Sequence, residues 1–480
     1  MLRHFNFAQS VPIQDLNERN ILGVYGQAEF SYNSYLYVTV AGRNDWVSNF
    51  SADNRSLFYP SVSVSFLPQQ VFSNFGESLG INFLKLRLGY GTSANFGDIG
   101  YPVAQQLGLD VRDSQTAGGQ NIITNEITLD LGNSGLQPEL LTETEVGLEA
   151  SAWDNRISLD LSLYQRVTQD LIIQRPLDPA ATGRTRTRTN IGEIKMRGIE
   201  FDLGVDIFPS SSPDELGWNA GVNFTAYENE VTDLGLDTDL VVYSGFSNLG
   251  NTAIVGQPLG VIFGGQALRT DDGELIVGSD GYYIDDPEDG VIGDPNPDFI
   301  ANFRTGLNYK NFNFNALVQW TQGGDISSAT ISTLMGRGLI TETIDREETF
   351  ILPGVRQNGT SADGSPIYVP NDIQINNSDY YFSNVLFGPS ELQIYDGTVI
   401  RLQEVSLGYT FPKAMLEKTP FGSVSLTASG YNLWFDAINT PDGANFDPNT
   451  SGTGVGNGFG FDFLNGPASR RYGLSLQAKF

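Results

Sequence analysis

Hydrophobic and polar residues alternate along many short segments of the chain, and the last segment shows the pattern clearly. Within residues 469–480 the apolar side chains occupy every second position, whereas the intervening positions are polar or glycine. Side chains of a β-strand point alternately to its two faces, so this segment predicts a strand with one apolar and one polar face. Such a strand could cross a bilayer or belong to a soluble sandwich, and repetition of the pattern distinguishes the two.

The alternation recurs along nearly the whole chain. We count about fourteen strands of this kind. Those with the clearest pattern are residues 24–32, 36–43, 58–66, 84–91, 143–152, 157–164, 199–207, 218–226, 299–309, 312–321, 402–411, 424–431 and 469–480. Short polar turns join some of them, as at residues 33–34, 154–155 and 310–311, and each such turn predicts a hairpin.

Long excursions separate the predicted hairpins. They lie near residues 92–138, 169–190, 229–296, 323–390 and 436–468. Outer-membrane barrels combine short periplasmic turns with long extracellular loops, whereas sandwiches and propellers spread their loop lengths more evenly. The pattern therefore predicts an all-β fold, an antiparallel transmembrane β-barrel, with residues 1–480 forming a single barrel domain.

The polar faces of the predicted strands carry ionisable residues. A soluble core would not bury such groups without partners, whereas a water-filled or plugged lumen accepts them. We expect these side chains to face the lumen: Glu143, Glu145, Glu149, Asp160, Asp202 and Arg304. The three glutamates could instead supply the acid and base of a glycosidase, but polar lining or contacts with a plug explain same-face neighbours better.

Composition narrows the class of function. The formal net charge of −29 argues against a nucleic-acid partner. The chain contains no cysteine, which excludes disulfides and thiolate metal sites within it. The lone histidine, His4, has no second histidine or cysteine to act with, and neither a GxSxG nucleophile motif nor a P-loop occurs. We therefore expect no catalytic site, and the protein is predicted not to be an enzyme.

Two groups of loop residues are candidates for ligand binding. Asp285, Glu288 and Asp289 gather carboxylates that suit Ca²⁺, but their spacing is not that of an EF-hand, and a solvated acidic turn is favoured. We expect no other cofactor. Aromatic residues in the loops could stack on sugar rings, or they could belong to the interfacial girdle of a barrel. The aromatic candidates for substrate contact are Tyr282, Tyr380, Tyr381, Trp434 and Phe435.

Several segments resemble one family, in the order in which that family carries them. They are FYPSVSVSF (58–66), LKLRLGYGTSAN (84–95), LQPELLTETEVGLE (136–149), NIGEIKMRGIEFDL (190–203), GQPLGVIFGG (256–265), GDPNPDF (293–299), YKNFNFNALVQWTQGGDI (309–326), VIRLQEVSLGYTFP (399–412) and YNLWF (431–435). Each segment alone is a common barrel-strand pattern, whereas the ordered set is specific. The chain resembles the C-terminal barrel portion of SusC-like (SusC/RagA-type) TonB-dependent outer-membrane transporters.

The resemblance implies both a function and a missing part. Members of this family import oligosaccharides or peptides across the outer membrane of Bacteroidetes-like Gram-negative bacteria, through a barrel of about 22 strands. Their partners are a SusD-like surface lipoprotein, the TonB–ExbB–ExbD system and the lipid of the outer membrane. The family's signal peptide, TonB box, plug and first barrel strands have no counterpart here. We therefore expect a partial barrel, which by itself could not perform coupled uptake.

The missing strands lead to a prediction about the last strand. In a closed barrel residues 469–480 would pair with the first strand of the whole protein. We expect this edge to be unpaired or to close on the strand at residues 22–32. Two other functions remain open at this point: a secreted or surface β-rich protein for glycan binding or adhesion, and a passive porin-like channel.

Overall fold

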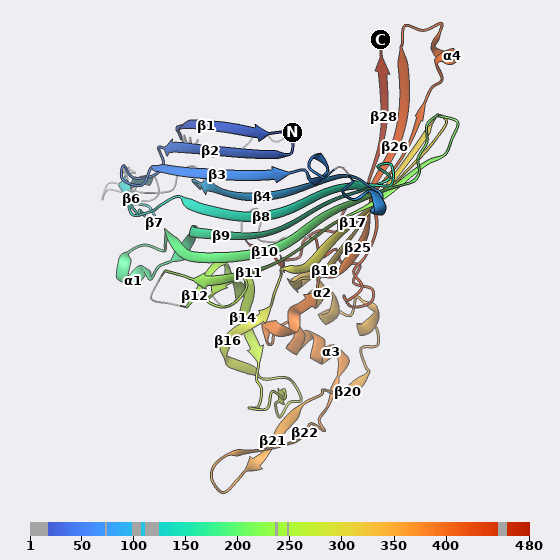
Figure 1. Ribbon diagram of the computed structural model, residues 1–480. Helices are drawn as coiled ribbons and strands as arrows, with labels where there is room; N and C mark the ends of the chain where they lie inside the picture. Colours follow the sequence, from blue (N-terminus) through green and yellow to red (C-terminus); the bar gives the residue numbers. More distant parts are fainter. Residues whose placement is uncertain are drawn as a thin grey trace, which may run out of the picture.

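The computed structural model describes residues 18–72, 74–97, 107–110, 124–235, 239–246, 249–449 and 458–480. His4 lies outside these residues. A large antiparallel sheet of fourteen strands dominates the fold and curves into a wall (Figure 1). Except for one short strand, each strand of the sheet pairs with the one that precedes it in the sheet along the chain. The predicted fold class, an antiparallel membrane barrel wall, is confirmed.

The strands of this wall are, in order, β1 (Ile21–Tyr32), β2 (Leu36–Val47), β3 (Ser56–Phe66), β4 (Ile81–Asn95), β8 (Glu139–Ala152), β9 (Ile157–Pro176), β10 (Arg186–Phe208), β11 (Gly217–Asp233), β17 (Pro297–Tyr309), β18 (Phe312–Gly323), β25 (Val399–Thr410), β26 (Ser423–Asp436) and β28 (Arg471–Lys479). The fourteenth, β7 (Asp130–Leu131), pairs in parallel with the start of β10.

One face of the wall is apolar and exposed. Cross-strand partners on this face form continuous rows, as in the row that joins Val146, Leu163, Ile199 and Ala226 across four strands. Val146 is 55% exposed and Leu163 is 50% exposed. Soluble monomers rarely expose large contiguous apolar patches, whereas a barrel wall presents such a band to lipid. We call this side the apolar face and the other side the polar face.

The strands are longer than the apolar alternation predicts. The pattern marks residues 199–207 and 218–226, whereas β10 and β11 span 186–208 and 217–233. The loop predicted near 169–190 is shorter than expected, since β9 and β10 stay paired up to Pro176 and Arg186 and leave only residues 177–185 as the connection. Alternation reports only the length of strand whose outer face is apolar. Beyond that length the outer face is polar while the backbone ladder continues.

The two edges of the wall remain separate. Among the described strands, β1 pairs only with β2, and β28 pairs only with β26. Figure 1 shows both as free edges. Of the two expectations for the last strand, the unpaired edge is therefore the one observed, and no pairing with residues 22–32 forms. An exposed strand edge is a template for pairing with a further strand.

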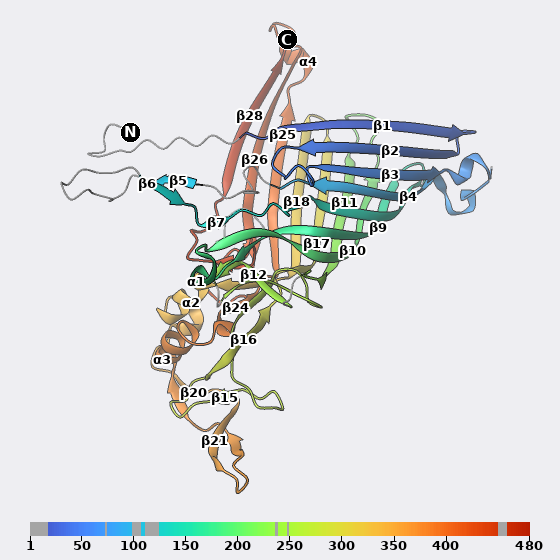
Figure 2. The same cartoon turned by 90° about the vertical axis from the view of Figure 1, so that its left-hand side faces the viewer.

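The long connections after β11, β18 and β26 gather at one end of the wall, which Figures 1 and 2 show from two sides. We call their described parts, residues 234–235, 239–246, 249–296, 324–398, 437–449 and 458–470, the loop domain. Its strands are β12 (Leu240–Phe246), β13 (Leu249–Ile254), β14 (Val261–Ala267), β15 (Ile276–Val277), β16 (Asp285–Gly293), β19 (Asp325–Ser328), β20 (Thr349–Ile351), β21 (Val355–Thr360), β22 (Pro366–Pro370), β23 (Gln374–Asn376), β24 (Ile394–Asp396) and β27 (Phe461–Asp462).

Helices are few and short. They are α1 (Pro179–Thr182), α2 (Ala329–Gly336), α3 (Asn377–Asp379) and α4 (Lys413–Leu416), with a π-helical segment at Tyr380–Val385. The connection after β4 adds the hairpin of β5 (Leu107–Asp110) and β6 (Thr124–Ile127). Within the described part of the chain, none of the helices has the length and apolar character needed to cross a membrane.

Candidate functional site

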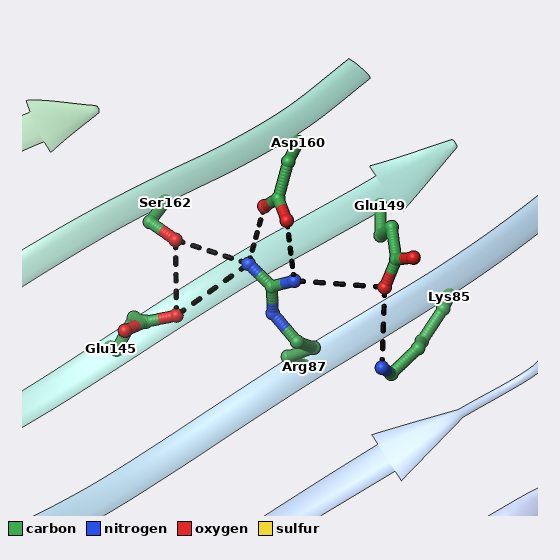
Figure 3. A network of polar contacts seen from close by, with 6 residues as sticks. All are labelled: Lys85, Arg87, Glu145, Glu149, Asp160 and Ser162. Atoms are coloured by element: carbon green, nitrogen blue, oxygen red, sulfur yellow. Dashed lines mark hydrogen bonds and ion pairs between the residues drawn. The ribbon is translucent and has the colours of Figure 1, made fainter. Parts of the chain in front are cut away.

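A cluster of ion pairs occupies the polar face where β4, β8 and β9 lie side by side (Figure 3). Arg87 is its centre. Two hydrogen bonds of 2.6 and 3.1 Å join its guanidinium to the carboxylate of Asp160. The same guanidinium donates to Ser162 Oγ at 3.2 Å and lies 3.8 Å from carboxylate oxygens of both Glu145 and Glu149. Three carboxylates thus share one guanidinium.

Glycine on the middle strand makes this geometry possible. Arg87 lies directly opposite Gly147 of β8, and it reaches over that residue to Asp160 on β9. A Cβ atom at Gly147 would lie 2.7 Å from Arg87 Nε. The same device recurs farther along the wall, where Arg304 of β17 passes over Gly221 of β11 and makes two 2.6 Å hydrogen bonds to Asp202 of β10.

The structure therefore brings the predicted lumen residues together on one face and gives each of them a cationic or anionic partner. Glu149 also accepts a 3.2 Å hydrogen bond from Lys85 Nζ, and Glu143 forms an ion pair with Arg166. The alternation already placed Lys85 and Arg87 in a strand, whereas Arg166 lies just beyond the predicted strand at residues 157–164. The alternation could not pair them, because a partner on another strand depends on register and not on spacing along the chain.

Replacing Arg87 with glutamine should destabilise the wall, because Glu145, Glu149 and Asp160 would face one another without the shared cation. These groups are partly solvated, so we expect a loss of about 1–2 kcal/mol in the free energy of unfolding. Urea unfolding of the intact protein in detergent micelles measures it. The control Arg304→Gln removes a cation with one carboxylate partner and should cost less, and equal losses would contradict the role of Arg87 as a shared centre.

The loop domain is held together by buried polar side chains that the sequence did not single out. Asn251 is fully buried. Its Oδ1 accepts a 3.0 Å hydrogen bond from the N–H of Phe459, and its Nδ2 donates to the C=O of Phe459 at 2.9 Å and to the C=O of Gly260. Asp462, also buried, accepts hydrogen bonds from Ser328 Oγ and from the N–H of Thr330 at the start of α2. The connection after β26 is thereby fastened to both other long connections.

A buried ion pair joins the same connection to the wall. Two hydrogen bonds, of 2.6 and 3.1 Å, link Arg401 of β25 to Asp447. The side chains are 7% and 5% exposed. Arg401 Nε is buried and has no hydrogen-bond partner in the described residues. Asp447 is therefore the group that offsets the cost of burying the guanidinium charge. Removing either partner would leave an uncompensated buried charge.

Burial also shifts the pKa of several groups in the loop domain. Loss of solvent raises the pKa of Tyr395 to about 12, although its contact with Ser332 acts in the opposite direction. Burial, together with the nearby carboxylates of Asp396, Asp294 and Asp298, raises the pKa of Asp325. The loop domain therefore has a dry interior of its own, unlike a set of solvated loops.

That interior accounts for three of the aromatic candidates. Tyr282 and Tyr380 pack against the cluster around Tyr283, and Tyr381 packs against the cluster around Met335. Burial raises the pKa of Tyr380. These three tyrosines hold the loop domain together, and their packing does not favour the predicted contact with substrate.

The two remaining aromatic candidates fall on opposite faces of β26. Trp434 lies opposite Leu402, which in turn lies opposite Val318, so it belongs to the apolar face. It is 47% exposed there, as an aromatic of the interfacial girdle would be. Phe435 lies opposite Arg401 on the polar face. Of the five aromatic candidates, Phe435 is the one that lies on the polar face of the wall.

The carboxylates proposed for Ca²⁺ lie in a strand and not in a turn. Asp285, Glu288 and Asp289 belong to β16, which pairs with β14. The pairing is irregular here, since Asp285 lies opposite Ala267 and Asp289 lies opposite Gly265. No group of three or more histidine, cysteine or acidic residues in the described ranges could hold a metal.

Comparisons with known proteins agree with this geometry. The model of the family described as TonB dependent receptor-like, beta-barrel matches residues 4–433. TonB-dependent receptor P3 of Formosa agariphila is 28% identical over 98% of this chain and 46% of its own length. TonB-dependent receptor SusC of Bacteroides thetaiotaomicron is 24% identical over 82% of this chain and 38% of its length. The chain thus spans about half the length, or less, of the curated relatives it matches.

A solved structure shows the same fold. The RagAB peptide transporter superposes with a TM-score of 0.71 at 19% sequence identity, over 98% of this chain and 49% of that one. Its open-open state gives a TM-score of 0.66. At this identity the likeness concerns the fold alone. Together with the family match over most of its length, the wall, its faces and its loop domain show that the chain belongs to the TonB-dependent receptor β-barrel family and is SusC-like.

Proposed function

We propose that this chain forms part of the wall and the loop domain of an outer-membrane transporter that takes up an oligosaccharide or a peptide at the expense of energy relayed by TonB. The wall lines the passage, and the loop domain covers its extracellular mouth. No covalent bond of the substrate changes in this process, so the activity is transport and not catalysis.

The observation that carries the proposal is the ion-paired polar face behind an exposed apolar face. In a wall that meets lipid on one side, ionisable side chains need water or polar partners on the other side. Arg87 and Arg304, with their carboxylate partners, supply such a lining. A plug domain with polar surface groups, or a hydrated substrate, would be compatible with it.

The loop domain has exposed apolar side chains that a partner protein could cover. Several large apolar side chains of the connection after β18 are exposed, among them Leu339 at 66%, Ile344 at 75% and Phe387 at 69%. Large exposed apolar side chains are rare on soluble monomers and are more common where another protein binds. We propose that a SusD-like lipoprotein covers this region. The net charge of −29 favours neutral or cationic substrates over anionic ones.

The test is uptake by cells that carry the intact protein. Candidate oligosaccharides and peptides are supplied in labelled form to the wild type, to a strain without this gene, and to a strain without TonB. We expect uptake of one class to require both the gene and TonB. Uptake that requires the gene but persists without TonB would show a passive channel, and uptake of every candidate without the gene would contradict the proposal.

A further inference from the structure

The outer face of the wall changes from apolar to polar side chains between two neighbouring rows of residues. On the side of the loop domain, the apolar row of Leu163 and Ile199 is followed by a row of exposed polar residues on the same four strands. This polar row consists of cross-strand partners, in the order Thr144, Gln165, Arg197 and Glu228. Because long barrel loops are extracellular, the row marks the height of the outer-leaflet headgroups.

A groove of about 640 Å³ lies at this boundary on the outer surface of the wall. Its lining is apolar on one side, with Leu163 and Ile199, and polar on the other, with Gln165, Arg197 and Glu228. An amphipathic lining of this kind matches a lipid at the point where its acyl chains meet its headgroup.

The charged groups of the groove are available for a ligand. Arg197 Nε donates a 3.1 Å hydrogen bond to Gln165 Oε1, and in the described part of the chain the guanidinium makes no other polar contact. Glu228 lies directly opposite Arg197 on the neighbouring strand, about 5 Å away along the sheet.

We propose that this groove binds a lipid that carries phosphoethanolamine. Arg197 would hold the phosphate through its two free Nη groups, and Glu228 would hold the ammonium. A cation and an anion on adjacent strands match a phosphate and an ammonium joined by two carbons. An anionic headgroup without the ammonium fits less well, since it would leave Glu228 facing an anion with no cationic partner. The proposal depends on the membrane placement of the proposed function, but not on its substrate.

The test measures which lipid stays bound. The intact protein is purified in detergent and offered phosphatidylethanolamine and phosphatidylglycerol in equal amounts, and native mass spectrometry counts the lipids retained. We expect phosphatidylethanolamine to be preferred, and Arg197→Gln to reduce its retention at least about tenfold, because a charge-assisted hydrogen bond to phosphate is lost. Glu228→Gln should abolish the preference by improving retention of phosphatidylglycerol.

The matched control is Lys195→Gln. Lys195 lies two residues from Arg197 on the same face, but it is paired with Glu193 at 3.2 Å and does not line the groove, so retention should be unchanged. A second comparison, lipid A with and without phosphoethanolamine, identifies the source of the headgroup. Equal retention of both phospholipids by the wild type, or equal loss in the Lys195 and Arg197 variants, would overturn the proposal. Uptake by the same cells, measured separately, reports on the proposed function.

Discussion

Replacing Arg401 with methionine should release the connection after β26 from the wall. Asp447 would remain buried with no cation beside it, a change that costs about 3–5 kcal/mol in buried ion pairs. Asp447 also accepts a hydrogen bond from the N–H of Asn449 and so orders its own turn. The loss of stability should therefore be confined to this connection. Hydrogen exchange of the intact protein measures it, and protection in residues 437–449 should fall by about a hundredfold or more.

Two further variants separate the buried charge from other causes. Arg401→Met combined with Asp447→Leu removes both charges and should recover most of the protection, since apolar replacement of a buried pair is often neutral. Arg356→Met breaks a pair of similar geometry with Asp372, but these side chains are 28% and 68% exposed. It should reduce protection far less than Arg401→Met does, because exposed ion pairs contribute little to stability. If the double variant were as unprotected as Arg401→Met alone, buried charge would not be the cause.

Arginine in place of Val222 should destabilise the wall strongly. Val222 lies in the middle of the apolar stretch of β11, with Leu203 and Phe303 as its cross-strand neighbours. An arginine facing lipid near the middle of the bilayer costs about 2–4 kcal/mol in barrels. Urea unfolding of the intact protein in phospholipid bilayers gives the free energy directly.

The adjacent residue supplies the control. Asn223 is on the polar face opposite Asp202, and Asn223→Arg should change the free energy of unfolding by less than about 1 kcal/mol. The two variants add the same side chain at neighbouring positions and differ only in the face that receives it. Equal costs at the two positions would contradict the assignment of the faces.

Much of the wall could be predicted from the sequence because a barrel strand repeats a simple rule. Apolar alternation located the start of β11 and both ends of β28 to within about two residues. The contrast between short turns and long connections predicted at which end of the wall the long loops gather. The alternation also placed Glu145 and Asp202 on the polar face, and the structure has them there.

The same rule failed where the outer face of a strand is no longer apolar. Both ends of the loop predicted near 169–190 are the paired continuation of β9 and β10, because backbone pairing does not need apolar side chains. Partners such as Arg87 with Asp160, or Arg401 with Asp447, depend on register and on loop packing, and neither is encoded in local spacing. Burial of Tyr380 within the loop domain required knowing that these loops form a core of their own.

The central claim is that this wall separates lipid from a polar interior, and spin labels along one strand test it most directly. This chain has no cysteine of its own, so single cysteines at Ile199, Glu200, Phe201, Asp202 and Leu203 of β10 can each carry one label. In the intact protein in bilayers, labels at 199, 201 and 203 should collide mainly with oxygen dissolved in lipid. Labels at 200 and 202 should collide mainly with a water-soluble nickel chelate. Equal access of the chelate to all five positions would contradict the account.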